Sequence, residues 1–191
     1  ITGVLRARKG LTRLIGSMTQ YDKIRVGTGA DKKYMPYKDI VPLASLDDIV
    51  FGTWDVYPQT AFQSAMYAEV LKKEDILPVE DELSAIKPMK AAFDRNYAKR
   101  LDGTNVKDCR DRWDMMEQIR EDIRRFKKEN GCDRIVVLWA ASTEIYVPVD
   151  KDVHYTLSAL EAAMKADDCE HIAPSMCYAY AAIMEGAPFI M

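Results

Sequence analysis

Small and polar residues follow three apolar runs of the sequence, at the point where each run ends. Asp55 follows the first run, the segment Ala140–Thr143 ends the second, and Ser175 follows the third. In open α/β sheets, ligands bind just outside the carboxyl ends of the strands. A carboxylate there accepts hydrogen bonds from a ribose or an amide. Small residues let a flat ligand reach the backbone, and a serine at a helix start offers a hydroxyl beside free N–H groups. These positions are candidate ligand contacts.

Each position also has an ordinary structural interpretation. Asp55 would cap a helix that begins near Pro58. The segment 140–143 would be a plain turn, and Ser175 would be the N-cap of the helix that follows it. Residue types alone do not separate binding from capping, so both interpretations stay open at this stage.

Other residues that often carry chemistry form no recognisable site. Gly27-Thr-Gly29 lacks the third glycine of a dinucleotide fingerprint, and Lys32, Lys33 and Pro36 behind it predict a loop, so we reject a nucleotide loop there. The four cysteines and two histidines have no metal-ligand spacing, and we expect no metal. Scattered thiols are typical of the reducing cytoplasm.

The composition excludes several classes of protein. Hydrophobic residues make up 48% and charged residues 30% of the 191 positions, as in ordinary globular proteins. The net charge of −3 argues against a nucleic-acid or anionic-membrane partner. The basic residues of 120–128 alternate with acidic ones, which is typical of an ion-paired solvent face. No apolar run approaches the roughly 20 residues that a membrane-spanning helix needs.

Short apolar runs predict the strands that would position the candidate residues. The runs over 48–54 and 134–140 are too short for helices and predict buried strands, and a third strand is expected near 171–173. Residues 187–191 also have strand character. We expect the chain to be cut at both ends, because domains rarely begin in a helix tail or end in a buried strand.

Longer stretches with apolar residues three and four positions apart predict helices. They cover 58–73, 91–101, 111–130 and 156–166, a last helix starts just after Pro174-Ser175 and ends at Gly186, and residues 1–10 are typical of a helix tail that Gly10 closes. Alternation of such strands and helices indicates an α/β fold, a Rossmann-like, doubly wound and mostly parallel sheet that is incomplete at both ends. We treat residues 1–191 as part of one such domain.

The same three strand ends carry a family resemblance. Ile49-Val-Phe-Gly-Thr-Trp-Asp55, Val136-Val-Leu-Trp-Ala-Ala-Ser-Thr-Glu144, and Ala173-Pro-Ser175 with Glu185-Gly186 resemble segments of the inositol-3-phosphate synthases, most closely the bacterial ones. The motifs occur in the family's order, and the resemblance covers essentially the whole chain.

The resemblance implies an isomerase that converts D-glucose 6-phosphate to 1D-myo-inositol 3-phosphate with tightly held NAD, the first step of inositol biosynthesis. Oxidation, enolisation, aldol cyclisation and reduction follow one another, and the cofactor carries the redox chemistry. It further implies a cytoplasmic homo-oligomer, a tetramer. The phosphate loop would precede Ile1 and the catalytic lysines would follow Met191, so we assign no catalytic residue here and expect the chain alone to be inactive.

Carried over by position, the NAD contacts are Asp55, Arg100, Ala140, Ala141, Ser142 and Thr143, with Ser175 as a further candidate. The chain departs from many relatives, which have Gly-Gly-Trp-Asp at 52–55, Thr-Ala-Asn-Thr at 140–143 and glutamine at Tyr97. Ser142 replaces some of the hydrogen bonding of asparagine, whereas the Tyr97 phenol does not mimic an amide.

Two other interpretations compete with the isomerase. One is a shortened, non-catalytic dinucleotide-binding or interaction module, which would bind NAD weakly or not at all. The other is an ordinary Rossmann-type dehydrogenase, which needs a complete glycine fingerprint and a catalytic acid or base that the sequence does not offer.

Overall fold

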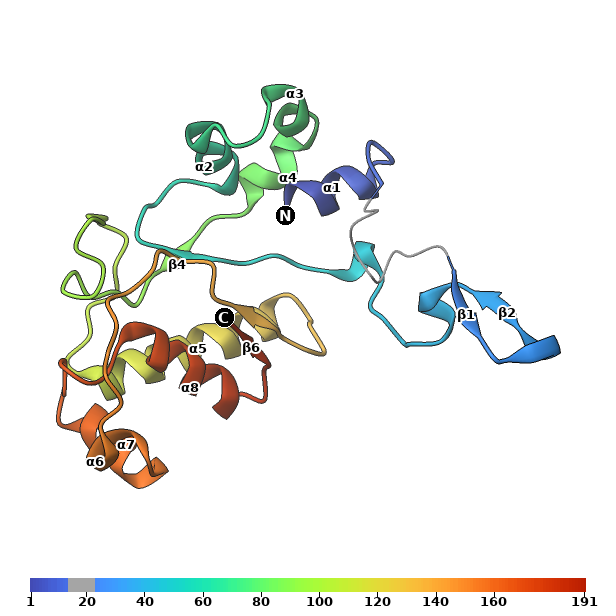
Figure 1. The fold of residues 1–191 in the computed structure, drawn as a ribbon. Coiled ribbons are helices and arrows are strands. Elements are labelled where there is room, and N and C mark those ends of the chain that lie inside the picture. Colours follow the sequence, from blue (N-terminus) through green and yellow to red (C-terminus); the bar gives the residue numbers. More distant parts are fainter. Residues whose placement is uncertain (14–22) are drawn as a thin grey trace. The chain divides into compact units, whose positions relative to one another are not determined.

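The computed structural model describes residues 1–13 and 23–191 (Figure 1). The chain divides into two compact units: residues 1–51 with 59–86 form the first, and residues 52–58 with 87–191 form the second. All the candidate contacts, from Asp55 to Ser175, belong to the second unit. No helix in the described part of the chain is both long and apolar enough to cross a membrane.

The first unit is mostly helical. Its core consists of Leu5, Ile76, Val79 and Leu83, against which Phe51 and the apolar side of α2 pack. A capping box formed by Thr60 and Gln63 starts α2, and Glu69 ends it in the left-handed conformation. The helices are α1 (Thr2–Arg8), α2 (Ala61–Ala68), α3 (Lys73–Ile76) and α4 (Glu80–Ala85), and β1 (Ile24–Val26) pairs antiparallel with β2 (Lys33–Met35).

The second unit contains two short parallel strand pairs. Strand β3 (Trp54–Asp55) pairs with β4 (Met89–Lys90), and β5 (Val137–Leu138) pairs with β6 (Phe189–Ile190). The chain between β5 and β6 passes through three helices. Such a helical crossover is what joining two parallel strands requires.

Four helices complete the second unit: α5 (Arg112–Glu129), α6 (Lys151–His154), α7 (Leu157–Lys165) and α8 (Pro174–Met184). Helix α5 packs against α8 and α7, and α6 packs against α7 (Figure 1). Fully buried side chains from α5, α7 and α8 meet in one core, which includes Met116, Ile119, Met164 and Cys177.

The α/β class predicted from the sequence is confirmed, and the long helices are close to their predicted bounds. Asp111 caps α5 by accepting the N–H of Asp114, and Thr156 caps α7 by accepting the N–H of Ala159. Pro174 begins α8, and Gly186 follows its end with a φ of +67°. The N-terminal helix also closes before Gly10, as expected.

Several predicted elements are wrong or shorter than expected. The strands over 48–54 and 134–140 shrink to two residues each, and the helix over 58–73 is α2 alone. No strand forms near 171–173, because the Asp168 carboxylate accepts the N–H groups of Glu170 and His171 and turns the chain into α8. The partner of β5 is β6. The helix expected over 91–101 is replaced by a bridge between Ala91 and Val106 and a turn.

Candidate cofactor site

Tyr178 of α8 brings the ends of β3 and β5 together. Its ring lies edge-on to Trp54, with ring centres 5.2 Å apart, and is tilted against Trp139 at 5.4 Å. Trp54 immediately precedes Asp55, and Trp139 immediately precedes Ala140. Two of the three predicted strand ends therefore meet on one buried aromatic ring. The Tyr178 hydroxyl accepts the N–H of Ala92 at 2.9 Å, which holds the ring in place.

Asp55 lies at the end of β3 and is half-buried. Its Oδ1 accepts the N–H of Tyr57 at 3.0 Å, while Oδ2 has no hydrogen bond within the described residues. The capping interpretation is wrong in its simple form, because Thr60 and not Asp55 caps α2. One carboxylate oxygen is thus available to a ligand, and the turn at Tyr57 orients it.

A buried ionic cluster supports the end of β3 from behind. Asp122 of α5 accepts the indole N–H of Trp54 at 2.8 Å and pairs with the ammonium of Lys107 at 2.6 Å and with Arg125. The side chains of Asp122 and Lys107 are only 4% and 8% exposed. Two cations and an indole satisfy this carboxylate, which makes the cluster a fixed support for the strand end.

Asn105 and Gly103 complete that support. The Asn105 side-chain amide donates to the backbone oxygens of Asp55 and Met89, at 2.9 and 3.1 Å, and so joins the ends of β3 and β4. Gly103 passes so close to Val56 that a Cβ would lie 2.1 Å from the Val56 oxygen. Only glycine fits at this crossing.

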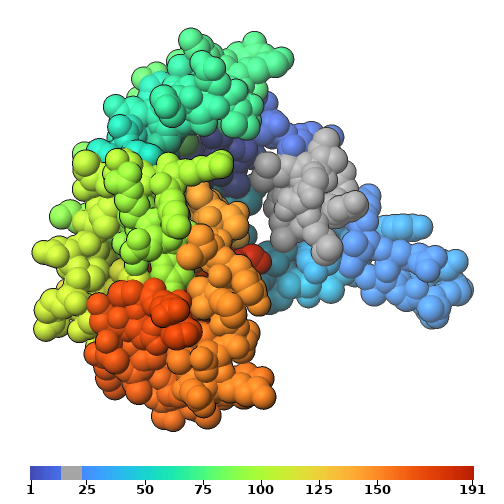
Figure 2. All heavy atoms as spheres, turned by 60° about the vertical axis from the view of Figure 1, so that its left-hand side comes forward, coloured from blue at the N-terminus to red at the C-terminus, as the bar shows by residue number. Residues whose placement is uncertain are grey.

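The segment Ala140–Thr143 leaves β5 as an exposed loop, within the orange part of the surface in Figure 2. The Ser142 and Thr143 hydroxyls have no hydrogen bond within the described residues, and no side chain larger than threonine stands in the loop. A flat ligand can therefore approach this backbone closely. A free carboxylate oxygen at Asp55 and open backbone at 140–143 are groups that fit an extended dinucleotide such as NAD, and each follows a tryptophan that contacts Tyr178.

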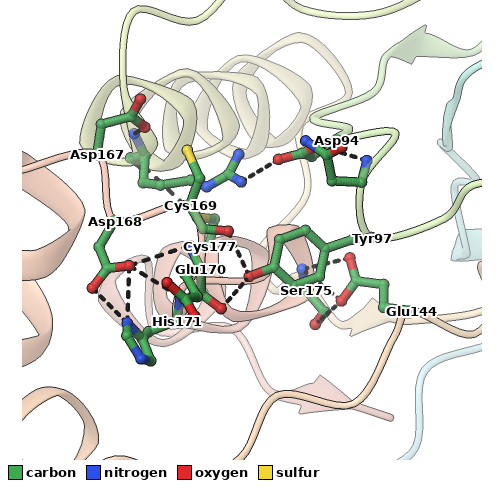
Figure 3. Close-up of polar contacts among 12 residues, drawn as sticks. Asp94, Tyr97, Glu144, Asp167, Asp168, Cys169, Glu170, His171, Ser175 and Cys177 are labelled. Atoms are coloured by element: carbon green, nitrogen blue, oxygen red, sulfur yellow. Dashed lines mark hydrogen bonds and ion pairs between the residues drawn. The ribbon is translucent and has the colours of Figure 1, made fainter.

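Ser175 is joined to the next residue of this loop (Figure 3). Its N–H donates to Oε1 of Glu144 at 3.2 Å, and its hydroxyl donates to Oε2 of the same carboxylate. Burial raises the pKa of Glu144, and the hydrogen bonds from Ser175 lower it only in part. The third predicted strand end is therefore connected to the second through Glu144, and Ser175 itself is buried.

A buried arginine organises the residues behind this contact. Arg112 of α5 pairs with Asp94, and its guanidinium lies 5.7 Å from the ring centre of Tyr97. The Tyr97 hydroxyl contacts the backbone oxygens of Cys169 and Glu170, at 2.9 and 3.0 Å (Figure 3). Burial raises the pKa of Tyr97 to about 12, so this phenol stays neutral. Tyr97 therefore has a structural role behind the site.

Arg100 is the one predicted contact that the structure does not join to the others. It ends the turn that contains Tyr97, its side chain is exposed, and within the described residues its guanidinium has no hydrogen bond or ion pair. An unpaired arginine at such a position remains available to an anionic ligand.

Sequence reasoning gave no role to the residues that connect the site, and its expectation that Asp122 lies on a solvated face of the long helix is wrong, because Asp122 is buried. Glu144, Asp122 and Tyr178 each lie next to, or one helical turn from, residues that were singled out, but their partners lie far away in the chain. Their residue types were a weak signal, because carboxylates are mostly exposed and tyrosines are only sometimes fully buried. Within the described residues, no three His, Cys, Asp or Glu side chains are grouped so as to hold a metal ion.

Comparison with known proteins identifies the family of the chain. A family model of an NAD-binding domain, described as myo-inositol-1-phosphate synthase, matches residues 1–191. Inositol-3-phosphate synthase 1 of Bacteroides thetaiotaomicron is 58% identical over the whole chain, which covers 44% of that protein. The synthase of Saccharomyces cerevisiae is 31% identical over 92% of the chain, which covers 35% of the yeast protein.

A solved structure has the same fold. The crystal structure of inositol-3-phosphate synthase from Caenorhabditis elegans superposes with a TM-score of 0.86 over 98% of this chain, at 25% identity, and the match covers 40% of that protein. The chain thus spans less than half the length of the relatives that it matches. The family model matches all 191 residues of the chain, a bacterial relative is 58% identical and the fold is shared. The chain therefore belongs to the myo-inositol-1-phosphate synthase family.

Proposed function

We propose that this chain is part of an inositol-3-phosphate synthase, an isomerase that converts D-glucose 6-phosphate to 1D-myo-inositol 3-phosphate. The observation that carries the proposal is the 58% identity to the bacterial synthase over every residue of the chain. The contacts of Tyr178 with Trp54 and Trp139 support it, because they join the ends of two strands and α/β folds bind ligands at such ends.

The proposed NAD contacts are Asp55, Arg100, Ala140, Ala141, Ser142, Thr143 and Ser175. NAD, when bound, would accept a hydride from the sugar phosphate and return it later, so that the sum of the steps is an isomerisation. Asp55 would accept hydrogen bonds from the cofactor, Arg100 would face its anionic groups, and the 140–143 loop would contact its flat surface. Glucose 6-phosphate would bind chiefly to residues outside this chain.

We further propose a cytoplasmic homo-oligomer, a tetramer, for the natural protein that carries this chain. All four cysteines are free thiols, which supports a reducing compartment. The exposed Leu138 and Ile190 are register partners on the β5–β6 pair. Exposed apolar side chains of this kind support contact with another part of the natural protein or with another subunit.

The activity test supplies the natural protein with glucose 6-phosphate and NAD and follows the phosphate by ³¹P NMR and NADH by absorbance. We expect inositol phosphate to form without net NADH. Stoichiometric NADH without inositol phosphate would favour an ordinary dehydrogenase, and the absence of both NAD binding and turnover would favour a non-catalytic module.

A matched pair of variants tests the proposed contacts. Arg100→Ala should weaken NAD binding, whereas Lys99→Ala, an equally exposed cation one position earlier, should not. Likewise Asp55→Asn should weaken binding, and Asp102→Asn, an exposed carboxylate of the same unit, should leave it unchanged. Equal effects within either pair would contradict the assignment.

A further inference from the structure

Glu144 fixes the chain immediately after the 140–143 loop. Its carboxylate accepts the N–H and O–H of Ser175 at the start of α8. The next N–H, that of Ile145, donates to the backbone oxygen of Tyr97 at 2.9 Å. Because the Tyr97 hydroxyl in turn contacts the chain at Cys169 and Glu170, the loop end is bound to the same framework that leads into α8.

The other end of the loop is fixed by the strand pair. The N–H of Trp139 donates to the oxygen of Ile190 at 2.8 Å. Residues 140–143 therefore span a short gap between two anchors. The first anchor is a backbone ladder, which tolerates side-chain substitution, whereas the second combines one backbone hydrogen bond, from Ile145 to Tyr97, with the side-chain carboxylate of Glu144. The conformation of the loop is thus most sensitive to Glu144.

A carboxylate is an unfavourable choice if the contact serves stability alone. Glu144 is half-buried, burial raises its pKa, and its direct partners are the uncharged groups of Ser175. The amide oxygen of a glutamine would accept the Ser175 N–H, and its NH2 group would donate to the Ser175 hydroxyl. No charge would then be desolvated. Residues that oppose local stability in this way are most often found at functional sites.

Resting on the proposed NAD site, we propose that Glu144 is a positioning residue that holds the 140–143 loop in its cofactor-binding conformation through Ser175. This role replaces the direct NAD contact proposed above for Ser175: the residue acts on NAD through Glu144, since its N–H and O–H are both directed to the carboxylate and its side chain is buried.

The primary test is calorimetric titration of NAD into the natural protein and its variants, well below their unfolding midpoints. Glu144→Ala should weaken NAD binding about tenfold, the scale of one lost hydrogen bond to a charged group. Glu144→Gln should recover only part of the loss, because its amide keeps a link to Ser175 but has one acceptor oxygen where the carboxylate has two. Unchanged NAD binding in Glu144→Ala, together with a lower unfolding midpoint, would reduce Glu144 to a purely structural cap.

A double-mutant cycle separates the action of Ser175 through Glu144 from direct contact with NAD. Ser175→Ala should weaken binding in the unsubstituted protein but add little in the Glu144→Ala background. Equal and additive losses in both backgrounds would mean that Ser175 contacts NAD itself, and would overturn the inference.

The pH dependence gives a readout that a passive cap would not change. A protonated Glu144 accepts fewer hydrogen bonds, so NAD binding should weaken as pH falls through its raised pKa. Arg112 of α5, Asp94 and Tyr97 of the preceding turn, and Cys177 of α8 also face this carboxylate. Glu144→Gln keeps all four and should lose the acid decline; an unchanged decline would contradict the proposal.

The failure of this inference is distinguishable from the failure of the proposed function. If the unsubstituted protein does not bind NAD, the proposed function falls and the inference falls with it. If the protein binds NAD and forms inositol phosphate while Glu144→Ala binds NAD equally well, only the positioning role is wrong.

Discussion

The ends of β3 and β5 are supported in opposite ways. Behind β3, the carboxylate of Asp122 meets two cations and an indole N–H in a nearly dry environment. At the far end of the loop that follows β5, the carboxylate of Glu144 accepts hydrogen bonds from the uncharged donors of Ser175 alone among the described residues, and burial raises its pKa. The comparison indicates that β3 ends on a fully satisfied ionic cluster, whereas the 140–143 loop is held by a half-buried carboxylate that has no charged hydrogen-bond partner.

Removal of the Asp122 carboxylate is the most direct test of the ionic cluster behind β3. Asp122→Ala leaves Lys107 buried without its counter-charge, and we expect the free energy of unfolding to fall by about 3–5 kcal/mol. Glu121→Ala changes an exposed carboxylate on the same helix and should alter it by less than about 0.5 kcal/mol. Urea denaturation measures the free energy of unfolding of both variants. Similar losses in the two would contradict the stabilising role of the ionic cluster behind β3.

Gly103→Ala tests the support of the β3 end without changing a charge. The new Cβ would meet the backbone oxygen of Val56, and we expect a loss of about 1–3 kcal/mol from overpacking. Gly52→Ala should cost less, because its Cβ would meet the side chain of Phe126, which can rotate away. Thermal unfolding of the two variants provides the measurement, and the reverse order would show that the crossing at Gly103 adapts.

Glu144→Gln should have the opposite sign from Asp122→Ala. The folded pKa of Glu144 lies above the unfolded value of 4.5, so ionisation destabilises the fold above the folded pKa and this penalty disappears below 4.5. We therefore expect Glu144→Gln to unfold at a higher temperature than the unsubstituted protein at pH 7.5, by a margin that shrinks on acidification. A margin that grows on acidification would contradict the raised pKa.

The smallest expected effect concerns His171, which lies beside the turn that leads into α8. Its Nδ1 is 2.8 Å from Oδ2 of Asp168, and the Asp168 carboxylate raises the pKa of His171. The pairing of His171 with Asp168 therefore stabilises the fold below the ordinary histidine pKa. This stabilisation is lost as pH rises through the raised pKa of His171. NMR titration should give a lower His171 pKa in Asp168→Asn, and an unchanged pKa would contradict this pairing.

Local signals in the sequence predicted the helices well, because caps are encoded within a few residues. Asp111 and Thr156 cap α5 and α7 within one residue of the predicted starts, and Pro174 begins α8 two residues before its predicted start. The strand near 171–173 was predicted wrongly, because Ile172 and Ala173 are buried in a turn and not in a sheet. Apolar character predicts burial but does not decide between these conformations.

The site was predictable only in part for a related reason. The residues at the strand ends follow from the alternation of elements, and the structure joins two of those ends through Tyr178. The pairings that hold them, Asp122 with Lys107 and Glu144 with Ser175, join residues 15 and 31 positions apart. A single sequence gives the charge of each residue but not its partner, since many alternatives are chemically equivalent.

The contact of Tyr178 with both Trp54 and Trp139 has an optical consequence. A phenol 5.2 and 5.4 Å from two indoles transfers its excitation to them efficiently, so light absorbed by Tyr178 emerges as tryptophan emission. Any event that separates the ends of β3 and β5 from α8 will alter that emission. The chain therefore carries its own unlabelled fluorescent reporter at the centre of the proposed cofactor site.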